Sequence, residues 1–321
     1  MAKAVADTRS PAENAAGYVS DEHQIIGFSH MHDSGTGGNP SLGNFPLFVH
    51  PGCPEDDFAK CDFSVLYRGT NRINGSAYAS PGYFTVNTTN GIRAEMTVTA
   101  HTALYRFSFP GTDTVNVTAY EDLPRETRIV PYSPLIVIDS LDLSGTRQNG
   151  TYEIDPDTGQ ATGWGKYSPS FGQGFYEAFV CADFKGAEIR HTGTFLAQNA
   201  SEIPKHGGIV YQAGSAGTWI QFKKPEDHTI LARVGVSFIS VEKACANAEA
   251  EIPDFSFARV ERDARKAWRE KLSAVEIDAT GVSEELQTTF WSGLYRTMLS
   301  PQNYTGENQL RWNSTEPYFD S

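Results

Sequence analysis

A two-residue alternation of apolar and polar side chains recurs from about residue 20 to residue 240 and indicates a mainly β chain. In residues 92–100 (IRAEMTVTA), apolar side chains stand at every second position. Since successive side chains of a strand point to opposite faces, this pattern predicts half-buried strands. Turn-forming clusters such as SGTRQNG, DPDTGQATG and QAGSAG separate the candidate strands at short intervals. Many strands with short turns and no helices between them predict an antiparallel β-sandwich rather than a parallel α/β sheet.

Local signals place several of these strands. Asn90-Gly91 lies between the apolar segment Tyr83–Val86 and the alternating segment, which predicts a type I′ hairpin. The alternation changes phase near His101–Ala103, and this requires a turn or a bulge, because a slip of one residue would move every side chain to the other face. Further strand candidates are Val115–Tyr120, Leu135–Leu143, Phe175–Phe184, Ile209–Gln212, Trp219–Phe222 and Ile230–Ile239.

The apolar period changes to that of a helix at Phe257. Apolar residues then recur at helical spacing as far as Leu272, with charged residues between them. Ser283, followed by two glutamates, is typical of the start of a second helix. The second helix has an almost all-round apolar surface, which predicts that it packs against further helices. That surface comprises Leu286, Phe290, Trp291, Leu294, Tyr295 and Met298. We therefore expect the chain to stop inside a helical domain and to self-associate through this exposed surface.

Composition and charge exclude several classes of protein. The 321 residues are 39% hydrophobic and 20% charged, which is a core-forming composition and excludes a disordered chain. The net charge is −13, and an acidic chain repels phosphate backbones and anionic lipids, so we expect no nucleic-acid or membrane-surface role. No apolar run approaches the ~18 residues that a transmembrane helix needs.

Cysteines and glycosylation sequons bear on the compartment. Cys53 and Cys61 flank a short polar segment in which a disulfide is plausible, although four reduced thiols remain the alternative. Seven asparagines lie in N-x-[ST] sequons, against roughly two expected by chance from 14 Asn and 52 Ser plus Thr. They are Asn74, Asn87, Asn116, Asn149, Asn199, Asn303 and Asn313. The start of the chain has no signal-peptide pattern. Either the sequons are accidental and the protein is cytosolic, or Met1 is not the natural start; we favour the second, and expect a secreted protein.

The densest cluster of glycine and polar residues is Gly27–Pro40 (GFSHMHDSGTGGNP). A phosphate-binding glycine loop would need a helix directly behind the glycines and a G-K-[ST] motif, and neither is present. A metal site could use His30 and His32, but a third firm ligand is not visible, so a cytosolic metal hydrolase stays a minor hypothesis. The remaining alternatives are a substrate-binding loop, in which small residues allow close approach and polar side chains bond to hydroxyl groups, and a plain polar turn between strands.

The run GFSHMHDSGTGG resembles the signature loop of family 92 glycoside hydrolases, the calcium-dependent exo-α-mannosidases. Three further segments resemble family motifs in the same order. They are IRAEMTVTAHTALYRFSFP (92–110), AWREKLS (267–273) and FWSGLYRT (290–297) followed by Pro301. The resemblance spans nearly the whole chain and is strongest to fungal members.

The resemblance implies an antiparallel β-sandwich, a linker helix and the first helix of an incomplete (α/α)6 barrel. We expect the sandwich at 1–250, the helical linker at 251–282 and the start of the barrel at 283–321. It further implies an inverting exo-α-mannosidase that trims mannose from N-glycans or glycoproteins and needs Ca²⁺. The expected catalytic carboxylates and calcium ligands lie outside this chain, which would be an N-terminal part shortened at both ends and inactive alone. The missing catalytic domain would pack on the linker and the terminal helices.

The resemblance implies that the residues matching the family signature form one wall of a mannose pocket. They are Ser29, His30, His32, Ser34, Gly35, Thr36 and Gly37, to which we add Asp320 at the start of the barrel. After the glycines the chain departs from the commoner family pattern, which bears on specificity for the leaving sugar. The alternative function, from a different class, is a non-catalytic carbohydrate-binding β-sandwich that uses the same loop.

Overall fold

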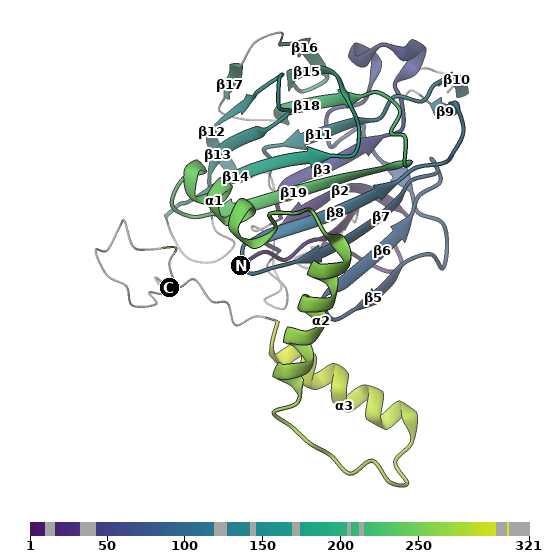
Figure 1. Cartoon of the computed structure of the whole chain (residues 1–321), viewed down its shortest axis with the longest axis vertical. Helices are drawn as coiled ribbons and strands as arrows, with labels where there is room; N and C mark the ends of the chain where they lie inside the picture. The colour runs from purple at the N-terminus through teal and green to yellow at the C-terminus, as the bar shows by residue number, and fades with distance from the viewer. Residues whose placement is uncertain are drawn as a thin grey trace.

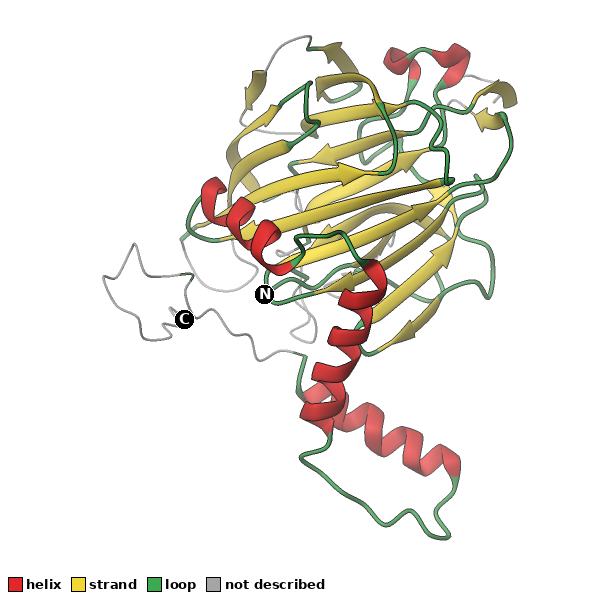
Figure 2. Ribbon diagram, in the orientation of Figure 1, coloured by secondary structure: helices red, strands yellow, loops and turns green. Residues whose placement is uncertain are grey.

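The computed structural model describes residues 1–9, 17–32, 43–118, 127–141, 146–168, 174–203, 207–211, 215–299 and 307. Within this part of the chain, two large antiparallel sheets face each other and three helices follow them (Figures 1 and 2). The prediction of a mainly β chain, a sandwich followed by helices, is confirmed. The start of an (α/α)6 barrel stays a prediction, as does the proposed division into domains.

The first sheet has eight strands in the described residues. In spatial order they are β1 (Val5–Thr8), β2 (Gln24–His30), β3 (Asn44–His50), β11 (Leu135–Asp139), β18 (Ala216–Phe222), β15 (Ile189–Leu196) and β16 (Asn199–Glu202), with β4 (Thr70–Asn71) paired to β2.

The second sheet has nine strands in the described residues. In spatial order they are β17 (Gly207–Tyr211), β12 (Arg147–Ile154), β13 (Ala161–Tyr167), β14 (Tyr176–Lys185), β19 (Thr229–Ser237), β8 (Thr102–Ser108), β7 (Arg93–Val98), β6 (Tyr83–Asn87) and β5 (Tyr78–Ser80). Two further strands, β9 (Thr114–Thr118) and β10 (Thr127–Pro131), form a separate ribbon.

The sequence pattern of β6, β7 and β8 is reproduced in the structure. β6 pairs with β7 through a turn in which Gly91 has a φ of 87°, so the predicted hairpin is confirmed. The predicted turn type is wrong, because type I′ also needs a positive φ at Asn90, and Asn90 has none. The change of phase near residue 101 is also confirmed: residues 99–102 turn the chain from β7 into β8. Alternate side chains of these strands then enter the core between the two sheets, including Met96, Tyr105 and Phe107.

Strand β11 shows why some strands do not alternate. All of its residues are buried, with Ile136 and Ile138 in the core between the sheets and Leu135 and Val137 in a second cluster on the outer face. A strand that is covered on both faces needs apolar residues at every position.

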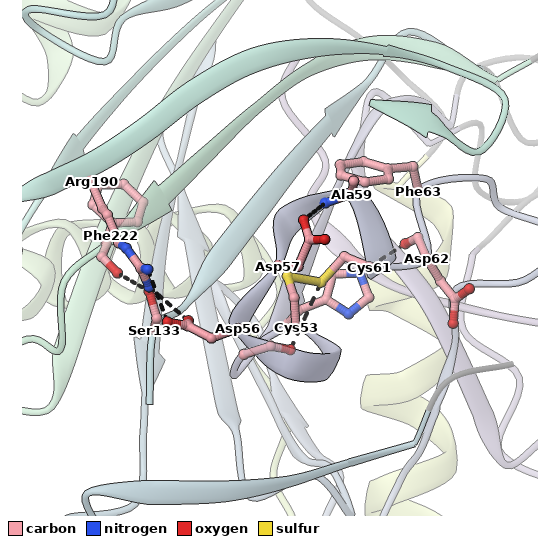
Figure 3. The surroundings of a disulfide bond; sticks show 12 residues. Cys53, Asp56, Asp57, Ala59, Cys61, Asp62, Phe63, Ser133, Arg190 and Phe222 are labelled. Carbon is pink, nitrogen blue, oxygen red and sulfur yellow. Dashed lines mark hydrogen bonds and ion pairs between the residues drawn. A yellow bond between two sulfur atoms is a disulfide. The ribbon is translucent and has the colours of Figure 1, made fainter. Parts of the chain in front are cut away.

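A disulfide-closed segment covers that outer face. The bond joins Cys53 to Cys61 and encloses two short 3₁₀ turns, η1 (Pro54–Asp56) and η2 (Phe58–Lys60) (Figure 3). Phe58, from inside the loop, stacks on Trp219 with ring centroids 4.6 Å apart. Asp56 anchors the loop to β15 through an ion pair with Arg190 at 2.7 Å. The disulfide at this position was expected, and it is confirmed.

The first helix, α1 (Val241–Glu251), was not predicted. It lies on the outer face of β14 and β19 (Figure 1) and is tied to β14 by the Cys181–Cys245 disulfide. Gly235 of β19 permits the contact, because a Cβ atom there would lie 2.2 Å from the Ala244 carbonyl oxygen. The helix therefore packs on the sheet through small side chains. Its sequence lacks the regular spacing of large apolar residues by which a helix is predicted.

The two predicted helices are present as α2 (Phe257–Leu272) and α3 (Glu284–Thr297). The first turn of α2 packs its Phe257 and Val260 side chains against Leu104 of β8 and Ile252. The helix then runs out beyond the edge of the sandwich and carries α3 at its far end (Figure 1). No side chain of α3 is buried, although Ser283 caps the helix as its sequence predicts. No helix in the described part of the chain is long and apolar enough to span a bilayer.

Candidate functional site

A cleft of about 1300 Å³ lies between the edge of the second sheet, the N-terminal residues and the helices α2 and α3. Residues 1–5 and His32 line one side, the ends of β5, β6 and β7 line the floor, and α2 with α3 closes the other side. The cleft thus joins parts of the chain that are more than 200 residues apart in sequence.

Close contacts fix α2 against the cleft floor. Gly82, in the turn between β5 and β6, has a φ of 85°, and a Cβ atom there would lie 3.0 Å from Ala264 of α2. The Arg106 guanidinium lies 4.2 Å from the centre of the Phe257 ring. The Arg265 guanidinium lies 5.4 Å from the centre of the Tyr83 ring, at the cleft itself. These cation–π contacts orient the helix without a large buried interface.

Aromatic rings from three elements face this cleft. Tyr83 comes from β6, Trp268 from α2, and Trp291 and Tyr295 from α3. The centroids of the Trp268 and Tyr295 rings are 4.7 Å apart, so the two helices present one aromatic surface. Rings of this type combine a flat apolar face with a polar edge, which suits a ligand that has both apolar and hydroxyl surfaces.

His32 forms the wall opposite the helices and is held by two acceptors. Its Nε2 lies 2.8 Å from Asp7 Oδ1, and its Nδ1 lies 2.8 Å from the Lys3 carbonyl oxygen. The second Asp7 oxygen accepts a hydrogen bond from the Ser29 hydroxyl. His32, Asp7 and Ser29 are all at most 1% exposed. Gly17 completes the packing, because a Cβ atom there would lie 2.5 Å from His32 Nε2. Both ring nitrogens are therefore engaged inside the protein, and His32 shapes the cleft rather than offering it a donor.

His30 lies elsewhere. Its ring is fully buried between the sheets, with Nε2 at 3.0 Å from the Tyr105 hydroxyl and the two rings in an edge-to-face arrangement. Burial lowers the pKa of His30 to about 3, so the ring is neutral at physiological pH. Of the three predicted residues that the structure describes, only His32 lines the cleft, and Ser29 supports it through Asp7. Ser34, Gly35, Thr36, Gly37 and Asp320 lie outside the described residues.

A polar cluster at the edge of the cleft was not predicted. His101 Nδ1 lies 2.6 Å from Glu251 at the end of α1. Burial by itself would raise the pKa of Glu251, but hydrogen bonds from His101 and Thr99 outweigh it and hold the pKa below its ordinary value. Glu307 is also buried here and accepts hydrogen bonds from the Ser237 hydroxyl and the Phe238 amide, each at 2.7 Å. This residue connects the segment after α3 to the end of β19.

Sequence reasoning missed Asp7, Glu251 and Glu307 because each is a single acidic residue in an unremarkable local context. Their partners are 22 to 152 residues away in the chain, so no short motif marks them. The cleft aromatics of α3 were noted only as an apolar stripe. No group of three His, Cys, Asp or Glu side chains in the described ranges is arranged to hold a metal ion.

Two family models match the chain in comparison with known proteins. The sequence profile for the glycosyl hydrolase family 92 N-terminal domain matches residues 1–237, and that for the glycosyl hydrolase family 92 catalytic domain matches residues 243–321. An uncharacterized secreted glycosidase of Arthroderma benhamiae is 46% identical over 330 residues, which cover 100% of this chain and 41% of that protein.

Solved structures share the fold. The glycosyl hydrolase ccman5 aligns with a TM-score of 0.76 at 21% identity, over 95% of this chain and 38% of its own. A family GH92 inverting mannosidase from Bacteroides thetaiotaomicron aligns with a TM-score of 0.73 at 20% identity, over 94% and 36% of the two chains. A Bacteroides thetaiotaomicron α-mannosidase in complex with mannoimidazole aligns with a TM-score of 0.69 at 18% identity, over 94% and 37%. The chain thus spans well under half the length of the relatives it matches.

Proposed function

Because the chain belongs to glycosyl hydrolase family 92, we propose that it forms the N-terminal sandwich and the start of the catalytic domain of a secreted exo-α-mannosidase. The activity we propose is the release of terminal mannose from N-glycans or glycoproteins with inversion at the anomeric carbon. The relatives of solved structure that are named as mannosidases support this proposal.

The observation that carries the proposal is the cleft shared by the two family regions. His32 and Tyr83 come from the region matched by the N-terminal domain, whereas Trp268, Trp291 and Tyr295 come from the region matched by the catalytic domain. In this proposal the sandwich supplies a rigid wall, fixed by Asp7 and Ser29 behind His32, and the helices supply rings for the sugar faces. The glycine-rich residues 34–37 are proposed to extend the same wall.

The chemistry of inversion requires two carboxyl groups that are ~6.5–9.5 Å apart with a water molecule between one of them and the sugar. The described carboxylates on the cleft, Asp263 and Glu270, both belong to α2. Asp263 is paired with Arg259 and Arg262, at 3.9 and 3.0 Å. We assign neither residue a catalytic role, and we propose that the chain alone does not hydrolyse mannosides.

The family resemblance implies a calcium ion, but no three His, Cys, Asp or Glu side chains converge to hold one among the described residues. We therefore derive no step through calcium in this chain. Its ligands are proposed to come from the rest of the catalytic domain.

The exposed face of α3 supports the same proposal. Leu286 is 61% exposed and Phe290 is 41% exposed, so this helix presents large apolar side chains to solvent. We propose that further parts of a catalytic domain pack on this face and close the cleft.

The test is a hydrolysis assay with an aryl α-mannoside. We expect no release of the aryl group by the purified 321-residue chain above a buffer blank, while an intact family 92 mannosidase serves as the positive control. Turnover by the chain alone would contradict the assignment of the catalytic carboxylates to a region outside it.

The alternative function, a non-catalytic carbohydrate-binding module, is favoured by the aromatic surface of the cleft. Calorimetry with mannose and α-mannobiose, with and without a calcium chelator, separates the two. Calcium-independent binding that is lost in Trp268→Ala would support the module; Trp164, a half-exposed residue of β13 outside the cleft, gives the control variant Trp164→Ala. Absence of any binding heat would count against the module and leave the mannosidase proposal intact.

A further inference from the structure

The cysteines indicate a compartment in which N-glycans are added. All four cysteines form disulfides, Cys53 with Cys61 and Cys181 with Cys245, and no free thiol remains. Disulfides of this kind form and persist in oxidising compartments such as the endoplasmic reticulum. The seven sequons can therefore be modified, and the structure describes the side chains of five of their asparagines.

The ribbon of β9 and β10 carries one of these asparagines. Along β9 the side chains alternate: Val115 and Val117 are buried, at 7% and 9% exposure, while Asn116 between them is exposed. Asn116 is paired directly with Ile129 of β10, whose side chain is 73% exposed. Directly opposed residues of an antiparallel pair lie on the same face with Cβ atoms about 4.5–5.5 Å apart. An aliphatic side chain in water thus lies beside an accessible amide.

The hairpin of β15 and β16 repeats this arrangement. Asn199 is exposed and is paired directly with Leu196, which is 46% exposed. The intervening turn is rigidly held, because the Gln198 side-chain oxygen accepts hydrogen bonds from the Phe63 and Ser64 amides at 2.9 and 2.6 Å. The orientation of Asn199 is therefore fixed by the body of the sandwich.

The other described sequons differ from these two. Asn87 and Asn149 are half-buried in strands of the second sheet, and Asn149 Oδ1 accepts a hydrogen bond from the Gly150 amide at 2.8 Å. Asn74 is exposed, but it lies in a turn and is not paired across strands with an apolar residue. Among the five sequons that the structure describes, only Asn116 and Asn199 combine an exposed amide with an uncovered aliphatic side chain directly across a strand pair.

We infer that Asn116 and Asn199 carry N-linked glycans and that the first sugar of each covers the opposed aliphatic side chain. The donor is an oligosaccharide linked to a lipid diphosphate. Asn Nδ2 loses one proton and forms a bond to C1 of the first sugar, while the bond from C1 to the lipid diphosphate breaks and the diphosphate leaves. The apolar C–H face of the sugar then removes Ile129 and Leu196 from water, which is favourable in proportion to the area covered. This inference does not depend on the mannosidase proposal.

The experiment is secretion of the full 321-residue chain from a yeast host with an added leader, followed by peptide mapping. Deglycosylation in heavy-oxygen water marks each occupied asparagine. We expect both sites to be occupied, and we expect Asn116→Gln and Thr118→Ala to remove the same single glycan, as Asn199→Gln and Ser201→Ala should at the other site. A secreted product with Asn116 and Asn199 unmodified would overturn the inference.

A second measurement tests the covering role. Loss of the Asn116 glycan by Thr118→Ala should raise the binding of an apolar dye, and adding Ile129→Ser should return it to the level of the glycosylated protein. Leu196→Ser should do the same in the Ser201→Ala background. Dye binding that does not change when the glycans are lost would refute the covering role, even if both sites are occupied.

Discussion

Replacing Asp7 tests whether the cleft wall is held by the buried pair of Asp7 and His32. In Asp7→Ala, His32 Nε2 loses its acceptor at 2.8 Å and the Ser29 hydroxyl loses its acceptor as well. Both groups are at most 1% exposed, so water does not replace the lost partner. Hydrogen bonds to a charged group contribute about 1.5–3 kcal/mol each, and removing one member of a buried pair costs about 3–5 kcal/mol. The estimate from two lost hydrogen bonds and the estimate from a broken buried pair agree, and we expect a loss of about 4 kcal/mol in the free energy of unfolding.

The assay is urea unfolding followed by tryptophan fluorescence. With a slope near 3 kcal/mol per M, the midpoint should fall by about 1 to 1.5 M. Asp7→Asn should cost clearly less, because its amide can donate to a neutral His32 ring while its oxygen still accepts from Ser29. Glu188→Ala is the control: it removes an exposed ion pair with Lys223 and should hardly move the midpoint.

An Asp7→Ala midpoint within about 0.3 M of the parent protein would refute this reasoning, since that corresponds to about 1 kcal/mol. A loss in Asp7→Asn as large as that in Asp7→Ala would instead show that the carboxylate charge, and not the hydrogen-bond geometry, carries the stability.

Three further predictions follow from the same structure. The pKa of His30 is about 3 in the folded protein, against an ordinary value of 6.5. Between these values the unfolded chain binds a proton at His30 and the folded chain does not. The free energy of unfolding should therefore fall by about 1.4 kcal/mol per pH unit as the pH drops from 6.5 towards 3. His30→Gln should flatten that slope in unfolding measurements between pH 6 and 4, and an unchanged slope would contradict the assignment. Replacing Cys181 and Cys245 by serine opens a loop of 64 residues and should cost about 4 kcal/mol by chain entropy, measured as a lower thermal midpoint; no shift would refute it. Gly235→Ala should destabilise by about 1–3 kcal/mol because its Cβ meets the α1 backbone. Gly174→Ala, at a glycine with φ 103° and no atom of the described residues within 4 Å of an added Cβ, measures the cost of conformation without that contact in the same unfolding assay.

The fold was predictable where side-chain period alone decides the structure. β7 and β8 alternate because only one face of each enters the main core, and α2 has a charged face because most of it is exposed. β11 was predicted as part of the strand Leu135–Leu143. The Cys53–Cys61 loop covers its outer face, and the position of this loop depends on tertiary contacts that the sequence does not show. Helix α1 was not predicted, because its buried face consists of Ala244, Asn247 and Ala248, and these residues give no strong apolar periodicity.

The site was predictable only in part. The signature segment includes His32, which lines the cleft, and the part of His32 in a mannose pocket stays a prediction. The sequence pattern could not separate His32 from His30, because residues two positions apart on a strand point to the same face. In the structure Met31, between them, has a positive φ, so the two side chains do not share a face. The aromatic surface could not be predicted, because it forms only when α2 and α3 pack together. The role of Asp7 could not be predicted, because its partner His32 is 25 residues away.

Helix α2 contacts the sandwich along its first half and extends beyond it with its second half, and this has a mechanical consequence. Its 16 residues span roughly 24 Å, while its buried side chains, Phe257 and Val260, belong to the first turn. A tilt of about 10° at that turn would move the far end by about 4 Å. The width of the opening beneath Trp268 is thus governed by the contacts of the first half of the helix, from Phe257 and Val260 at its start to Ala264 beside Gly82.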